Sequence, residues 1–149
     1  MSYQEKKALL NLGVYVIALL LYADYVHTHY WEEGMTTDEL LVFWSKFLLI
    51  TIPFQIVIHI ISHIIINIMR GMANGGKIKD EVEDEFDKII ELKSTRNSMV
   101  FFAICFMGAL GYLAWGKGVN HFFIAIVIGG VVSEVIDALS RVYYYRRGV

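Results

Sequence analysis

Four apolar stretches, each long enough to form a helix that crosses a bilayer, dominate this sequence. They cover approximately residues 8–30, 39–69, 97–116 and 120–141. A membrane-spanning helix needs about 20 mainly apolar residues, and all four stretches meet that length. Hydrophobic residues make up 56% of the chain and its mean hydropathy is +0.51, both high for a soluble domain. The sequence therefore predicts an all-α fold, a polytopic membrane protein with four transmembrane helices in a single domain, residues 1–149.

The first stretch begins like a signal peptide, and the second is longer than a membrane span needs to be. Lys6 and Lys7 precede the first stretch, as in a signal peptide, but the apolar run is long and no small-residue cleavage site follows. We therefore interpret it as a retained span. The second stretch is about thirty residues long, and Pro53 near its middle removes one backbone donor, so we expect this helix to tilt or kink.

The positive charges outside the spans predict the orientation of the chain. Lys117 alone falls in a loop on one side, and all other such cations fall on the opposite side: Lys6, Lys7, Arg70, Lys77, Lys79, Lys88, Lys93, Arg96, Arg141, Arg146 and Arg147. The positive-inside rule then places both termini and the long loop 70–96 in the cytoplasm. The acidic loop 31–38 is expected outside, where aromatic residues also gather near the ends of the spans.

The long loop 70–96 contains a helical pattern. After the turn signal Asn74-Gly75-Gly76, apolar residues recur every three or four positions, at Ile78, Val82, Phe86, Ile89 and Ile90. This pattern predicts a cytoplasmic amphipathic helix between spans two and three, which we expect to run directly into the third span. Such a helix would lie on the bilayer surface or bind a cytoplasmic protein partner through residues 78–95, and a solvated connector is the alternative.

One segment resembles a known group of proteins. The acidic-to-basic segment Asp84-Glu85-Phe86-Asp87-Lys88-Ile89-Ile90-Glu91-Leu92-Lys93-Ser94-Thr95-Arg96, directly before the third span, resembles that of small predicted four-helix bacterial inner-membrane proteins of unknown function. The resemblance implies a multi-pass protein of the bacterial cytoplasmic membrane and supplies no catalytic residue. Some of those proteins are encoded beside a small helix-turn-helix regulator, so a partner of that type is implied by analogy. We expect no direct contact with nucleic acid, because the net charge is -2.

Two charges fall in the outer halves of the first two spans. Asp24 and Lys46 lie at similar expected depths, and a charge inside a bilayer costs at least about 2.5 kcal/mol on insertion scales. An ion pair between the two helices would reduce that cost. The alternatives are that Lys46 extends its ammonium to the outer interface, or that the two charges form an external ligand pocket.

The inner halves of the spans hold a second polar group. His59 and His63 are spaced i, i+4 on one helix face, and Glu134 and Asp137 are spaced i, i+3 on the fourth span. Two imidazoles and two carboxylates suit Zn²⁺, Mn²⁺ or Fe²⁺, which makes a divalent metal the cofactor hypothesis. Polar packing between helices and a proton or substrate pathway explain the same residues, so all three interpretations stay open.

The outer ends of the spans contain three further histidines, His27, His29 and His121, which form a second polar site or simply occupy the interface. Haem is less favoured as a cofactor, because His27 and His121 are the one pair suited to its two faces. The single cysteine, Cys105, lies in an apolar run and is expected to act as a small packing residue.

Small residues in the last two spans predict a tight hairpin or, alternatively, a homodimer interface: Gly108, Gly111, Gly129, Gly130 and Ser133. No nucleotide-binding loop, nucleophile elbow or HExxH sequence is present, so an enzyme is disfavoured. The sequence is most typical of a small non-enzymatic membrane protein, regulatory or partner-binding, with an intramembrane polar cluster. A metal-binding protein and a proton-coupled transporter acting as a dimer are the two alternatives.

Overall fold

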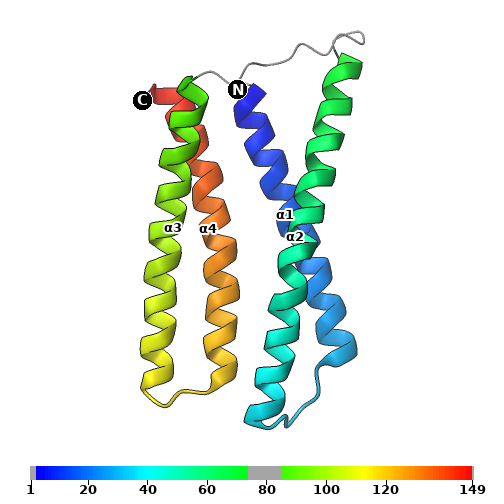
Figure 1. Cartoon of the computed structure of the whole chain (residues 1–149), viewed down its shortest axis with the longest axis vertical. Helices are drawn as coiled ribbons and strands as arrows, with labels where there is room; N and C mark the ends of the chain where they lie inside the picture. Colours follow the sequence, from blue (N-terminus) through cyan, green and yellow to red (C-terminus); the bar gives the residue numbers. More distant parts are fainter. Residues whose placement is uncertain (1–2, 74–84, 149) are drawn as a thin grey trace.

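The computed structural model describes residues 3–73 and 85–148, and these residues form four α-helices (Figure 1). The helices are α1 (Tyr3–Tyr30), α2 (Thr37–Ala73), α3 (Glu85–Ala114) and α4 (Val119–Arg147). Helices α1 and α2 form one hairpin, and α3 and α4 form another. The two termini lie together at what we call the terminal end, and the loops 31–36 and 115–118 lie at the loop end. The predicted all-helical fold is confirmed.

Each of the four helices is long and apolar enough to cross a membrane. Much of their apolar surface points away from the other helices, and Leu49 and Met107 keep 72% and 66% of their surface exposed. A soluble protein rarely exposes large apolar surfaces of this extent, whereas lipid tails solvate them without cost. Length and composition thus make the chain a candidate multi-pass membrane protein.

Local sequence signals account for where α2 begins and how far it extends. The side chain of Glu39 accepts hydrogen bonds from the backbone N–H and hydroxyl of Thr36, at 2.8 and 2.9 Å, which forms a capping box before the first turn. The helix then continues through Pro53 to Ala73, so the proline does not end it.

Helix α3 is longer than the predicted third span. It begins at Glu85 and runs without interruption into the apolar stretch that follows residue 96. The charged residues before the third span therefore belong to the same helix. Residues 78–84, where the predicted amphipathic helix begins, lie outside the described residues. Ile90 and Ser94 in this segment have no exposed surface, so one side of it is packed inside the protein.

The closest helix pair is the hairpin of α3 and α4, which lie side by side in Figure 1. The Ser133 hydroxyl donates to the Ser98 carbonyl oxygen at 2.7 Å, and the α4 backbone at Gly129 approaches Cys105 so closely that an added Cβ would lie 3.1 Å from the Cys105 Cβ. The predicted small-residue contact thus forms at Gly129 and Ser133. A Cβ added at Gly108 or Gly111 would meet no atom within 4 Å, so these two glycines make no such close contact.

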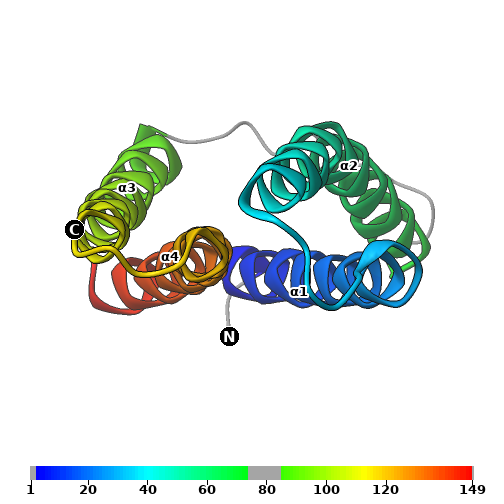
Figure 2. The same cartoon turned by 90° about the horizontal axis from the view of Figure 1, so that it is seen from below.

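Helix α4 joins the two hairpins, as Figure 2 shows from the loop end. The α4 backbone approaches both α1 and α2, whereas within the described ranges the α3 backbone approaches neither. At the loop end, the Trp44 indole N–H donates to the Asn120 side-chain oxygen at 2.9 Å and its ring stacks on Phe123, with 5.6 Å between centroids. Trp44 is buried there with Val26 and Phe47. The loop end is therefore held together by aromatic packing.

Candidate functional site: a polar cavity at the terminal end

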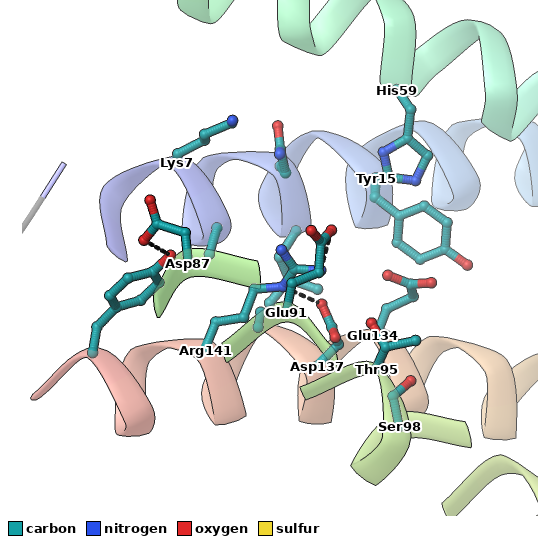
Figure 3. A pocket seen from close by; sticks show the side chains of 15 residues that line it. Lys7, Tyr15, His59, Asp87, Glu91, Thr95, Ser98, Glu134, Asp137 and Arg141 are labelled. Carbon is teal, nitrogen blue, oxygen red and sulfur yellow. Dashed lines mark hydrogen bonds and ion pairs between the residues drawn. The ribbon is translucent and has the colours of Figure 1, made fainter. Parts of the chain in front are cut away.

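A cavity of about 410 Å³ lies between the two hairpins near the terminal end, and all four helices contribute to its lining (Figure 3). This volume falls within the range of about 300–1,000 Å³ that is common for small-molecule sites. The lining is rich in charged and aromatic side chains: Lys7, Tyr15, His59, Asp87, Glu91, Glu134, Asp137, Arg141 and Tyr145. Four carboxylates and two permanent cations face one space, so the cavity is acidic overall.

The structure brings together three of the four residues that were predicted to form a metal site. His59 from α2 lines the cavity with Glu134 and Asp137 from α4. The side chain of His63 lies outside the described part of the structure. Among the side chains that are described, no group of three or more histidine, cysteine, aspartate or glutamate residues has an arrangement that could hold a metal ion. The geometry therefore supports a shared polar site and gives no support to a metal centre.

Arg141 neutralises one side of the cavity. Its Nε donates to Asp137 Oδ2 at 2.7 Å, and its Nη2 lies 3.5 Å from Glu91 Oε1. The first contact is an i, i+4 pair within α4, and the second connects α4 to α3. The other oxygen of Asp137, Oδ1, is buried and has no hydrogen-bond partner within the described residues. Asp137 thus depends on Arg141 for compensation of its charge.

A hydrogen bond between helices occupies another carboxylate of the cavity. The Tyr145 hydroxyl donates to Asp87 Oδ1 at 2.8 Å, which joins the start of α3 to the end of α4. Asp87, Glu91 and Asp137 therefore each have a protein partner. Of the four carboxylates, Glu134 is the one that forms no hydrogen bond or ion pair with another residue in the described ranges.

Two aromatic rings lie beside the carboxylate of Glu134. In Figure 3 this carboxylate points toward Tyr15 and His59, which line the same cavity. The rings of Tyr15 and His59 stack at a centroid distance of 6.2 Å with 18° between their planes. The Tyr15 hydroxyl accepts a hydrogen bond from the Gln55 amide at 3.1 Å, which holds the ring in place. A carboxylate next to aromatic faces is suited to an organic cation, because both attract positive charge.

Sequence reasoning missed the residues that α3 and the end of α4 supply to this cavity. Arg141 was interpreted as a cytoplasmic charge that sets the orientation, and Glu91 as part of the acidic-to-basic segment before the third span, yet both line the cavity beside the predicted residues. One signal was present, because Asp137 and Arg141 are spaced i, i+4 and carry opposite charges. The contact of Arg141 with α3 could not be predicted from residue spacing, because it depends on how α3 and α4 pack against each other.

The predicted ion pair between Asp24 and Lys46 is absent among the contacts of residues 3–73 and 85–148. Both side chains are exposed, and neither forms a hydrogen bond or ion pair with a described residue. Lys46 instead lines a second cavity at the loop end, which does not include Asp24. The two charges are therefore accommodated separately.

The three outer histidines are exposed, and each contacts an aromatic ring close to it in sequence. His27 stacks on Trp31 at 5.9 Å, and His29 stacks on Tyr25 at 4.4 Å and bonds to its carbonyl oxygen at 2.9 Å. His121 lies 6.0 Å from the Tyr112 ring. No contact joins the three histidines to one another in the part of the chain that the structure covers. This arrangement favours the interface interpretation over a joint polar site or a haem site.

No family model, curated protein or solved structure matches the chain. The class of the protein rests on its four long apolar helices, and its function must be argued from the cavity.

Proposed function

We propose that this chain is a non-enzymatic, multi-pass protein of the bacterial cytoplasmic membrane whose polar cavity binds a small organic cation. The observation that carries the proposal is the carboxylate of Glu134, which forms no hydrogen bond or ion pair with a described residue and points toward Tyr15 and His59. An ammonium group bound there would pair with the carboxylate and contact the aromatic faces. The cavity is far larger than the 10–15 Å³ or so that one water molecule requires, so a molecule with several heavy atoms fits.

The orientation proposal places this cavity on the cytoplasmic side. The terminal end carries nearly all cations that lie outside the spans, and Lys117 alone belongs to the loop end. By the positive-inside rule, both termini and residues 70–96 are cytoplasmic. A cation would then reach Glu134 from the cytoplasm.

A regulatory role follows from the way α3 borders the cavity. Asp87 and Glu91 line it, and both belong to the segment 78–95 that is predicted to bind a cytoplasmic protein. A cation in the cavity changes the electrostatic environment of these two carboxylates. We therefore propose that occupancy of the cavity is sensed by a cytoplasmic partner through this segment.

Transport of the same cation is the second proposed function, and the contacts between the hairpins favour it. The backbones of α1 and α2 approach only α4 in the other hairpin, within the described residues. One hairpin can thus move against the other without separating α3 from α4, as alternating access requires. This alternative requires a homodimer, and it predicts that Glu134→Gln removes flux of the cation in proteoliposomes.

Binding is tested with fluorobenzylamine as the cation and fluorobenzyl alcohol as its neutral analogue, by fluorine NMR titration of purified protein in detergent micelles. We expect the amine to bind about tenfold more tightly than the alcohol, and Glu134→Gln to remove that difference. Asp24→Asn is the matched control, because it neutralises a carboxylate outside the cavity. Equal binding of amine and alcohol, or unchanged amine binding in Glu134→Gln, contradicts the proposal.

Elemental analysis of the same preparation tests the metal alternative. If the wild type contains stoichiometric Zn²⁺, Mn²⁺ or Fe²⁺ and His59→Ala does not, the ligand of the cavity is a metal ion and the organic-cation proposal is wrong.

A further inference from the structure

The loop end contains a second cavity of different composition. It has a volume of about 640 Å³, lies against α1 and α2, and is lined mainly by aromatic and aliphatic side chains such as Tyr25, Phe47 and Ile50. Its charged residues are Asp38, Glu39 and Lys46, all of them from α2. An apolar cavity at the outer part of a membrane span is filled most readily by an acyl chain.

Lys46 is the one cation of this cavity, and it forms no hydrogen bond or ion pair within the described ranges. It lies nine residues after the start of α2, about 13 Å along the helix at ~1.5 Å per residue. A lysine at this depth of a bilayer costs at least about 2.5 kcal/mol on insertion scales unless water or an anion stabilises it. The phosphate of a phospholipid is the anion available at this depth, since a lysine side chain extends toward the headgroups.

The acidic, basic and apolar residues of the cavity follow one another along α2 in the same order as the ammonium, phosphate and acyl chains of one kind of phospholipid. Asp38 is at the start of the helix, Lys46 is two turns deeper, and Ile50 lies one turn beyond Lys46. A phospholipid with a primary amine carries its ammonium outermost, its phosphate next and its acyl chains deepest. Glu39 is occupied by its hydrogen bonds to Thr36, so Asp38 is the carboxylate available to the ammonium.

We propose that this cavity binds one phospholipid with a zwitterionic, primary-amine headgroup, of the phosphatidylethanolamine type. The phosphate pairs with Lys46, the ammonium with Asp38, and an acyl chain lies along Val42, Phe47 and Ile50. An anionic lipid fits less well, because Asp38 and Glu39 repel additional negative charge at the mouth of the cavity. This lipid site is independent of the cation site proposed for the terminal end.

The test is native mass spectrometry of the detergent-purified protein titrated separately with phosphatidylethanolamine, phosphatidylcholine and phosphatidylglycerol of identical acyl chains. We expect one phosphatidylethanolamine to bind about tenfold more tightly than either of the other lipids. Lys46→Gln should remove this tight site, and Lys46→Arg should retain it. Lys117→Gln, which neutralises a cation in the other loop at the same end, should bind as the wild type does.

Asp38→Asn provides a second, independent arm. It should keep the phosphate contact but lose the preference for phosphatidylethanolamine over phosphatidylcholine, because the ammonium has lost its carboxylate. Equal binding of the three lipids, a preference for phosphatidylglycerol, or wild-type binding by Lys46→Gln would each overturn the assignment.

Discussion

The two ends of the four-helix assembly differ in how their charged side chains are compensated. At the terminal end, Arg141 compensates Asp137 and Glu91, and Tyr145 hydrogen-bonds to Asp87. At the loop end, aromatic rings pack around Trp44 while Lys46 has no partner among the described residues. Where four helices line a cavity, side chains of the protein pair with three of its four carboxylates, and Glu134 is the exception. Where two helices line an apolar cavity, Lys46 has no such partner among the described residues.

The largest effect is expected when the terminal end loses its central cation. Arg141→Ala leaves the Asp137 carboxylate without compensation, and we expect it to lower the free energy of unfolding by about 3 kcal/mol. Unfolding in mixed micelles with increasing dodecyl sulfate measures this change. Arg141→Lys is the control that keeps the charge and should recover part of the loss.

A double-mutant cycle shows whether the loss comes from the pair. Asp137→Asn combined with Arg141→Ala should be more stable than Arg141→Ala alone, because the uncompensated carboxylate is gone. If the losses in the free energy of unfolding of the two single variants simply add in the double variant, the ion pair between Arg141 and Asp137 does not stabilise the terminal end.

A smaller effect is expected at the close contact within the α3 and α4 hairpin. Gly129→Ala places a Cβ 3.1 Å from the Cys105 Cβ, so one helix must shift, and we expect a loss of about 1 kcal/mol in the free energy of unfolding. Gly130→Ala adds the same methyl group where no atom lies within 4 Å and should not destabilise the protein. Cys105→Gly in the Gly129→Ala background should restore stability. Equal effects at both glycines would refute the close packing.

The smallest effect is expected at the loop end. Trp44→Phe removes the hydrogen bond to Asn120 but keeps an aromatic ring, and interhelical hydrogen bonds in membranes contribute about 0.6 kcal/mol on average. We therefore expect a loss of that size in the same unfolding assay. Trp115→Phe is the matched control, since Trp115 is 86% exposed. A loss in Trp44→Phe that exceeds the loss in Arg141→Ala would contradict this order of effects.

The sequence predicted much of the fold because apolar length and charge placement act locally along the chain. The limits of the first span matched the end of α1 at Tyr30, whereas α3 began earlier than the predicted span, at Glu85. The recurrence of apolar residues at Phe86, Ile89 and Ile90 had indicated helix before the third span, whereas average hydropathy alone does not register it. Residue spacing also suggested a shared polar group for His59, Glu134 and Asp137 if their helices are neighbours, and the structure places all three at one cavity.

The rest of the site depends on how the helices are arranged, which spacing does not determine. Tyr15 was not predicted as a site residue, although it stacks on His59 across two helices. Asp24 and Lys46 lie at similar depths in sequence terms, yet only Lys46 lines a cavity. The depth of a residue in a membrane follows from its position along one helix. The direction in which its side chain faces depends on how that helix packs against its neighbours.

Thiol labelling of the two cavities tests the contrast between the two ends most directly. In a Cys105→Ala background, Thr95→Cys introduces a thiol at the terminal cavity and Val42→Cys introduces one at the loop-end cavity. We predict that a charged, membrane-impermeant maleimide labels Thr95→Cys from the cytoplasmic side of inverted vesicles and leaves Val42→Cys unlabelled. Labelling of Val42→Cys, or absence of labelling at Thr95→Cys in folded protein, would contradict a water-accessible polar cavity at one end and a lipid-filled cavity at the other.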